Sequence, residues 1–152
     1  MGTTMKEQVA IRNALPSDLD AVIALDYSVP AKEKQSYWCG IFDHYVNCDA
    51  SDRHFLVAEI NNRVVGFIIG EVRAWEFGSP RCGWVFTLSV SPQKREMGIG
   101  QMMFEEICRS LKRVGVTTVR TMVERDNMLS LSFLRSQGLT SGRYVELEKL
   151  VD

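Results

Sequence analysis

The sequence predicts an α/β (α+β) fold built on one mixed β-sheet. Two observations lead to this prediction. Apolar, β-branched runs joined by tight turns dominate the middle of the chain, and strand patterns then alternate with helix patterns towards the C-terminus. Strands joined by tight turns form an antiparallel meander, whereas a strand, a helix and a strand in succession form a right-handed parallel crossover. We therefore expect a meander followed by a β-α-β-α-β half.

The first half of the chain predicts one strand, two helical segments and a hairpin. Val9 and Ile11 alternate with polar residues, as in a half-buried strand, and Pro16 is a helix start signal. A tight turn at Asn61 and Asn62 closes the hairpin. The expected ranges are a strand over Gln8–Asn13, a helix from about Pro16 to Val29, a helical region over Lys32–Asn47, and strands over His54–Ile60 and Arg63–Trp75.

The second half predicts the alternating part of the fold. Ser91 and Pro92 end a strand, and after them apolar residues recur at helical spacing. Gly115 and Gly138 mark the ends of helices. The expected ranges are a strand over Gly83–Val90, a helix over Gly98–Val114, a strand over Val116–Val123, a helix over Asn127–Gln137 and a last strand over Tyr144–Val151.

Length and charge limit the classes of function. The 152 residues suit one domain, which we expect to span residues 1–152. The chain has 18 basic and 19 acidic residues, a formal net charge of −1, so no overall basic field points to nucleic acid as a partner. No apolar run reaches membrane-spanning length, and the first residues lack the apolar segment of a signal peptide. We expect a cytoplasmic protein without a membrane partner.

The cysteines predict no metal site. They are scattered without a C-x-x-C pair, and only His44 and His54 could join them. His44 and Cys48 have the spacing of one helix face, but two ligands do not make a zinc site. We expect free thiols in a reducing compartment. The four are Cys39, Cys48, Cys82 and Cys108.

The stretch Arg95–Gln101 predicts an anion-binding turn. It follows a buried strand and places Gly98 and Gly100 at the first turn of a long helix, where unpaired N–H groups and the helix dipole attract anions. Gln101 and Met102 stand where a P-loop needs Lys and Ser or Thr, and Met103 stands where a Rossmann fingerprint needs its last Gly. The alternative interpretation is that the glycines only allow the helix to pack closely on the sheet.

Two motifs resemble the GNAT superfamily of N-acetyltransferases. Val90–Gly100 reads V-x-P-x-x-R-x-x-G-I-G, which is similar to the family's acetyl-CoA loop, R/Q-x-x-G-x-G/A. Val123–Leu139 resembles the strand–Asn–helix–Gly segment that follows it in the family. The order of elements matches as well, so the resemblance covers nearly the whole chain. It implies the GNAT fold, with helices on both faces of the sheet, and acetyl-CoA as co-substrate without a metal.

The resemblance also implies which residues bind the cofactor. In the family the fourth and fifth strands part, and the pantetheine arm pairs with the exposed backbone of the fourth strand. The amide near Leu88 is then a catalytic group, because it polarises the thioester carbonyl. Asn127 matches a family Asn that bonds the arm, although an ordinary helix cap explains it equally well. The cofactor-binding set is Leu88, Ser89, Val90, Arg95, Glu96, Met97, Gly98, Ile99, Gly100, Gln101, Asn127, Ser130 and Phe133.

The sequence departs from the family at the acid and the base. The family's general acid is a Tyr where this chain has Leu134, so water or another group such as Tyr144 replaces it, or the activity is altered. The fourth strand carries no carboxylate near Phe86. The nearest carboxylates are Glu71 and Glu76, and we select Glu71 as the catalytic base. A surface ion pair between Glu71 and its neighbour Arg73 is the alternative role, and His44 is a second base by its chemistry alone.

The expected function is transfer of the acetyl group of acetyl-CoA to a primary amine by direct attack in a ternary complex. A non-catalytic acyl-CoA-binding module of the same fold and an interaction domain are the alternatives. The amine is a small molecule, a peptide N-terminus or a lysine, and a homodimer stays open. Aromatic and acidic residues either form a pocket for a cation or belong to the core and surface. These are Trp38, Trp75, Glu71, Glu76 and Asp43.

Overall fold

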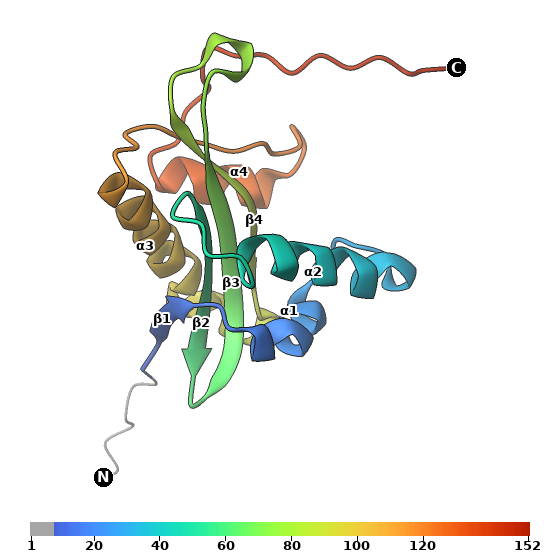
Figure 1. Ribbon diagram of the computed structural model, residues 1–152, viewed down its shortest axis with the longest axis vertical. Helices are drawn as coiled ribbons and strands as arrows, with labels where there is room; N and C mark the ends of the chain where they lie inside the picture. Colours follow the sequence, from blue (N-terminus) through green and yellow to red (C-terminus); the bar gives the residue numbers. More distant parts are fainter. Residues whose placement is uncertain (1–7) are drawn as a thin grey trace. The chain divides into compact units, whose positions relative to one another are not determined.

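The computed structural model describes residues 8–152, and its contacts divide the chain after Thr121 into two units (Figure 1). The units are described separately, and the expectation of one domain over residues 1–152 stays a prediction. Among the described residues, no helix combines the length and the apolarity needed to cross a membrane.

The first unit contains a five-stranded sheet in the order β1-β2-β3-β4-β5. The first four strands are antiparallel neighbours, and β5 pairs with β4 in parallel. The predicted mixed sheet, a meander followed by a parallel crossover, is therefore confirmed. The strands are β1 (Ala10–Asn13), β2 (Arg53–Ile60), β3 (Arg63–Arg73), β4 (Cys82–Val90) and β5 (Val119–Arg120).

The turn between β2 and β3 has the predicted tight geometry. Asn61 and Asn62 both have positive φ, at 50° and 64°. Two left-handed residues give a hairpin turn whose twist matches that of the flanking strands, and Asn adopts this conformation more easily than other non-glycine residues. The asparagine pair thus sets the register of β2 and β3 next to the turn, and an extra residue at Val65 shifts that register beyond Glu59.

Helices α1 (Leu19–Leu25) and α2 (Ala31–Tyr45) cover one face of the sheet, and a short 3-10 helix, Pro16–Asp18, precedes α1 (Figure 1). Their apolar side chains pack on Phe67 and Ile69 of β3. Trp38 belongs to this core: it is 1% exposed, and its Nε1 donates a hydrogen bond to Asp26 at 2.8 Å. Of the two roles expected for Trp38, the structure shows the core role.

Helix α3 (Ile99–Arg113) covers the opposite face, where glycines replace side chains. A Cβ added to Gly66 or Gly70 would lie 2.9 Å from Met103 Cε or 3.1 Å from Ile107 Cδ1. The helix thus lies against the sheet backbone. Helices therefore cover both faces of the sheet, as the resemblance implies.

Gly83 is the tightest of these contacts, and we expect its replacement to destabilise the fold. A Cβ there would lie 2.5 Å from Cδ1 of Leu111, a fully buried side chain. The Gly83→Val variant should lose about 2 kcal/mol of unfolding free energy, the usual cost of overpacking a core. Urea denaturation measures it. The control is Gly40→Ala in α2, where nothing lies within 4 Å of the added Cβ and helix propensity should raise stability by up to about 1 kcal/mol. A Gly83→Val midpoint equal to wild type would contradict the packing argument.

His54 makes the stability of the first unit depend on pH. It lies on β2 opposite Gly70, and among the described residues its buried Nε2 has no hydrogen-bond partner. Burial lowers the pKa of His54, and the nearby Asp52 opposes this only in part. Protonation then favours the unfolded chain, so stability is full above the unfolded pKa of about 6.5 and falls as the pH drops through the lower folded pKa.

We therefore expect the thermal unfolding midpoint to decrease as the pH is lowered from 7.5 to 5.5. This decrease should be smaller in the His54→Leu variant. The only other histidine gives the control, because His44→Gln should retain the dependence. Equal pH profiles for wild type and His54→Leu would show that other groups cause the fall.

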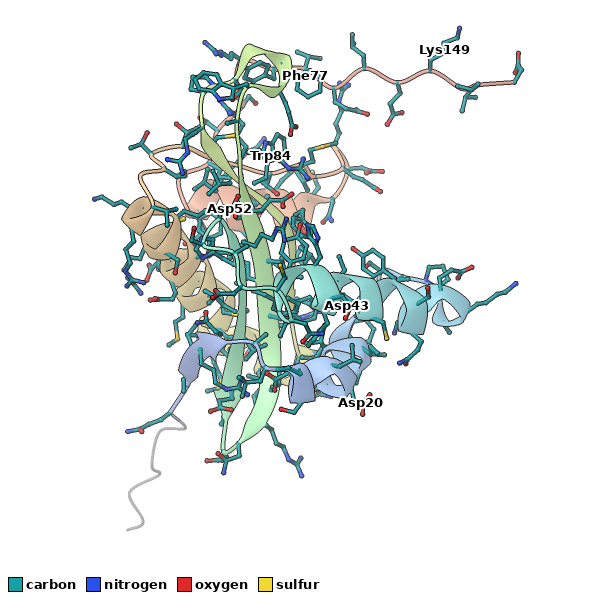
Figure 2. All side chains as sticks on the ribbon, viewed as in Figure 1. Asp20, Asp43, Asp52, Phe77, Trp84 and Lys149 are labelled. Atoms are coloured by element: carbon teal, nitrogen blue, oxygen red, sulfur yellow. The ribbon has the colours of Figure 1, made fainter. Side chains whose placement is uncertain are left out.

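The loop between β3 and β4 carries the other tryptophan of the expected pocket. Trp75 and Phe77 have positive φ, at 70° and 55°, and are 75% and 88% exposed. Phe77 lies at the tip of the hairpin (Figure 2). The two expectations for the tryptophans were a pocket for a cation and separate roles in the core and on the surface. The structure shows separate roles: Trp38 lies in the core and Trp75 lies on the surface.

The second unit, residues 122–152, contains one helix, α4 (Met128–Ser136). Asn127 begins it by accepting a hydrogen bond from Ser130 N at 3.1 Å. Gly138, at φ 93°, ends it, with Leu139 N donating to Leu134 O as in a Schellman motif. The predicted helix over Asn127–Gln137 is confirmed.

Two strand predictions in the second half differ from the structure. The strand expected over Val116–Val123 is confined to Val119–Arg120. The strand expected over Tyr144–Val151 is wrong: this segment has no regular structure, and Leu147 and Leu150 are 90% and 94% exposed. An alternating apolar pattern favours an extended chain, but a strand also needs a neighbour that pairs with its backbone, and the pattern does not specify that neighbour.

Candidate functional site

The side of β4 that faces β5 is a free edge over most of its length. β5 pairs with β4 only at Gly83 and Trp84. Beyond Trp84, β4 continues to Val90 with no strand of the described chain paired on that side. The fourth and fifth strands part, as the resemblance implies, and the parted edge presents backbone N–H and C=O groups.

A β-bulge at Phe86 decides which amides face the free edge. Ile69 pairs with Thr87 and Gly70 with Val85, so Phe86 is an extra residue on β4. Bulges commonly re-aim the groups that follow them.

Two hydrogen bonds fix the direction of the β4 backbone on either side of the bulge. Gly83 N donates to Thr118 O at 2.8 Å, towards β5, and Ser91 N donates to Val65 O at 2.7 Å, towards β3. Alternate residues of a strand direct their backbone groups to opposite sides. Counting back from Ser91, the N–H groups of Leu88 and Val90 point to the free edge. Uninterrupted alternation from Gly83 through every residue of β4, Phe86 included, would instead turn the Leu88 N–H towards β3.

Ser89 lies between these two residues and has a different part in the structure. Its backbone faces β3, where it is opposite Phe67. Its hydroxyl donates a hydrogen bond to Leu25 O at 2.9 Å, which ties β4 to the end of α1. Of the three predicted edge residues, Leu88 and Val90 therefore present their backbone to the free edge, and Ser89 holds the strand in place.

The turn that we predict to bind an anion lies at the start of α3. A 3-10 helix, Pro92–Met97, leads into Gly98 at φ 73°, and α3 begins at Ile99. Nothing lies within 4 Å of the position that a Cβ would take on Gly98. The first N–H groups of α3, from Ile99 to Gln101, have no acceptor within the helix. The open space and the free donors fit a phosphate.

The side chains of this turn have distinct positions. Ile99 is fully buried, so only its backbone is available to a ligand. Arg95 and Glu96 are exposed, and Arg95 Nε lies 3.5 Å from Val90 O. Met97 is 38% exposed, and Gln101 Nε2 donates to Glu105 Oε1 at 3.0 Å. The positive charge of Arg95 therefore lies between the end of β4 and the turn.

A second group of residues lies on the sheet face that α2 covers. Glu71 of β3 pairs across the strands with Trp84 and accepts bonds from Arg73 Nε at 2.9 Å and Nη2 at 2.8 Å. The ion pair expected as the alternative role of Glu71 is thus present. The Tyr45 ring lies 5.4 Å from that of Phe86, and burial together with the nearby Glu71 raises the pKa of Tyr45. Tyr45, at the end of α2, is therefore near both Glu71 and the bulge.

The other base candidates are placed differently. Glu76 lies in the loop beyond the end of β3, in the 3-10 helix Glu76–Gly78. His44 is exposed near the end of α2 and contacts the ring of Tyr45 at 5.0 Å. Of these three residues, Glu71 alone lies on a strand next to β4.

The predicted residues of the second unit lie on one helix. Asn127 and Ser130 form the first turn of α4 through the capping bond, and Phe133 follows one turn later. Leu134, at the family's Tyr position, and Tyr144 belong to the same unit, and Arg143 Nη2 donates to the Tyr144 hydroxyl at 2.8 Å. The helix-cap role of Asn127 is present in the structure.

Sequence reasoning missed Tyr45 and the bulge at Phe86. The periodicity around Tyr45 is irregular because Lys32–Asn47 carries aromatic residues on more than one side, so the pattern does not single out Tyr45, which packs against the core. Phe86 gives no local signal, because a bulge is a mismatch in residue count between two strands.

Comparisons with known proteins agree on the family of this site. The family model described as "Acetyltransferase (GNAT) family" matches residues 20–139. An L-2,4-diaminobutyric acid acetyltransferase of Nocardia farcinica is 30% identical over 97 residues, 64% of this chain and 49% of that protein. An N-alpha-acetyltransferase of Sulfurisphaera tokodaii is 27% identical over 115 residues, 71% of this chain and 65% of that protein. The chain thus spans about half to two thirds of the length of these relatives.

Solved structures share the fold at low sequence identity. The aminoglycoside N-acetyltransferase AAC(6')-Iy in complex with CoA superposes with a TM-score of 0.78 at 15% identity, covering 97% of this chain and 98% of that chain. A transcriptional regulator from Bacillus halodurans C-125 gives a TM-score of 0.76 at 16% identity, covering 95% and 100%. At these identities the likeness concerns the fold alone.

Proposed function

The chain belongs to the acetyltransferase (GNAT) family, and we propose that it transfers the acetyl group of acetyl-CoA to a primary amine. One observation carries the proposal. The bulge at Phe86 turns the Leu88 and Val90 amides to the free edge of β4, in the same unit as the anion-binding turn at Gly98. An amide-bearing arm that ends in a phosphate is the kind of ligand this pair of features fits.

The chain's own groups would hold the cofactor in two places. The backbone of Leu88 and Val90 would pair with the pantetheine amides, as an added strand pairs with a sheet edge. The N–H groups from Gly98 to Gln101, with the charge of Arg95, would bind the pyrophosphate. The resemblance assigns Asn127, Ser130 and Phe133 to the arm as well, and this stays a prediction.

The proposed reaction is direct attack in a ternary complex. The amine nitrogen attacks the acetyl carbonyl, a C–N bond forms, and the C–S bond breaks to release CoA. The Leu88 N–H stabilises the oxyanion as it develops, and Glu71 accepts the proton that the amine loses. Leu134 cannot donate a proton, so water protonates the departing thiolate, which is a tolerable leaving group because a thiol has a pKa of about 8.5.

The relatives support a primary amine as acceptor without naming one. They are named for acetylation of diaminobutyric acid, of an N-alpha group and of aminoglycosides, and each of these acceptors is an amine. We also propose that residues 1–152 act as one cytoplasmic domain.

A non-catalytic acyl-CoA-binding module is the second candidate, and specific observations favour it. The family's general acid is replaced by Leu134, and the strand position near the bulge holds Phe86 rather than a carboxylate. The proposed base is in addition held in an ion pair, with Arg73 Nε and Nη2 both on its Oε1.

Two measurements on the wild-type protein separate these candidates. Release of free thiol from acetyl-CoA is followed with a panel of diaminobutyrate, a peptide, a polyamine and an aminoglycoside, and thermal unfolding is followed with and without CoA. Turnover together with CoA stabilisation supports the enzyme, since a ligand that binds only the native state raises stability. Stabilisation without turnover supports the binding module. If the protein neither releases thiol nor is stabilised by CoA, both candidates are wrong and an interaction domain is favoured.

A further inference from the structure

Three side chains of β3 and β4 meet where β5 stops covering β4. Trp84, labelled in Figure 2, is the last residue of β4 that pairs with β5, and on its other side it pairs with Glu71 of β3. Arg73 follows Glu71 by two residues on β3, so its side chain lies on the same face of the sheet. The proposed base therefore lies beside the point at which the free edge of β4 begins.

Arg73 holds the carboxylate of Glu71 at one oxygen. Its Nε donates to Oε1 at 2.9 Å, and its Nη2 lies 2.8 Å from the same oxygen. The Glu71 side chain is 15% exposed, so much of the water that would weaken an ion pair is excluded. Oε2 lies outside this ion pair, and an ionised carboxylate can accept a proton at either oxygen. The arginine thus restrains the base without occupying both of its oxygens.

Trp84 in turn holds the guanidinium of Arg73. The Cζ atom of Arg73 lies over the Trp84 ring, 5.8 Å from its centroid. An aromatic face attracts a cation, and the planar guanidinium also stacks on it. Strand pairing on both sides fixes the backbone of Trp84. The arginine is therefore held between the indole and the carboxylate, and it loses the side-chain freedom that makes most surface ion pairs weak.

We infer that Arg73, supported by Trp84, is a positioning residue that holds Glu71 by Oε1 and directs Oε2 towards the acceptor amine. The inference rests on the proposed function, in which Glu71 accepts the amine proton. Arg73 acts through Glu71 and not on the reacting atoms, so its removal should change the use of the amine and not the binding of acetyl-CoA.

Arg73→Ala tests the inference through activity. We expect kcat/KM for the amine to fall about tenfold, the smaller end of what a hydrogen bond to a charged group contributes. The KM for acetyl-CoA should not change. In the Glu71→Gln background the same substitution should cause no further fall, because the carboxylate that it positions is gone. The control is Arg63→Ala at the other end of β3, which should keep wild-type activity.

Chemical rescue distinguishes positioning from a contribution to the fold. Millimolar guanidinium should restore part of the activity that Arg73→Ala loses, because the free ion can bind between the Glu71 carboxylate and the Trp84 ring. Urea at the same concentration has a similar shape without the charge and should restore nothing. A residue needed only for stability would not be replaced by a denaturant, so a loss that guanidinium leaves unchanged would give Arg73 a structural role and overturn the inference.

Unfolding of the free protein gives a readout that does not need activity. In urea denaturation, Arg73→Ala should cost less stability in the Glu71→Gln background and in the Trp84→Leu background than in wild type, because each background removes one of its contacts. Additive effects on stability would overturn the inference even if no amine is turned over. Unchanged or raised kcat/KM in Arg73→Ala would overturn it while leaving the proposed function intact. An absence of turnover in wild type, with both stability couplings present, would count against the proposed function alone.

Discussion

Glu71→Gln should lower kcat about 100-fold at neutral pH and leave the affinity for acetyl-CoA unchanged. Gln keeps the shape of Glu and a hydrogen-bond acceptor but cannot take a proton. General bases contribute about 10²–10⁴-fold, and we expect the low end because Arg73 already binds this carboxylate. Thiol release at saturating acetyl-CoA, followed between pH 6.5 and pH 9.5, measures the effect. The deficit should shrink as the pH approaches the amine pKa, because a free amine needs no base.

Glu76→Gln is the matched control for this loss. It makes the same chemical change on the loop that follows β3, away from the sheet. A crippled Glu76→Gln beside an active Glu71→Gln would show that the base is the other carboxylate. Full activity in both variants would assign the proton to water or to another residue.

Gly100→Leu should weaken CoA binding at least 30-fold without lowering the stability of the free protein. Gly100 lies in the first turn of α3, and in the resemblance its backbone binds the pyrophosphate, so we expect an added Leu side chain to take the place of the phosphate. Leu is a better helix former than Gly, so the helix itself does not lose stability. Titration calorimetry with CoA and thermal unfolding of the free protein measure the two quantities separately.

Two further variants at this turn separate a blocked phosphate from a strained backbone. Gly100→Ala should bind CoA nearly as wild type, since the family pattern permits Ala there. Asn adopts a left-handed φ, such as the 73° of Gly98, more easily than other non-glycine residues do. A loss of CoA affinity in Gly98→Asn would therefore report the added side chain more than backbone strain. Unchanged affinity in all three variants with a lowered unfolding midpoint would mean that the glycines serve only the packing of α3.

The parts of the fold that the sequence predicted well are those set by neighbours in the chain. The Asn61-Asn62 turn, the Asn127 cap and the glycine at the end of α4 each act within a few residues, and each is present. The strand over Tyr144–Val151 depends instead on pairing with a distant segment. Its apolar residues favour an extended chain, but such a composition states a propensity and leaves the partner open.

The same distinction applies to the candidate site: features set by neighbours in the chain were predictable, and contacts between distant segments were not. The turn at Gly98 was predictable because a strand, a loop, two glycines and a helix follow one another directly in the chain. The contact of Tyr45 with Phe86 joins residues from α2 and β4, and nothing in either segment specifies it. The direction of the Leu88 amide depends on a mismatch between two strands, so the resemblance rather than the residues pointed to it.

The bulge of β4 has a consequence for how this chain can change over evolutionary time. The odd number of residues between Gly83 and Ser91 makes the bulge necessary, whatever their identities, because the N–H groups of those two residues point to opposite sides of the strand. Point substitutions leave that number unchanged, so a saturation scan of β4 would report side-chain packing, such as the contact of Gly83 with Leu111, and not the bulge. Losing one codon there would leave an even number, and a regular strand without a bulge would then satisfy both hydrogen bonds. Purifying selection at this place therefore acts on length, and insertions and deletions reveal it where exchanges of side chains do not.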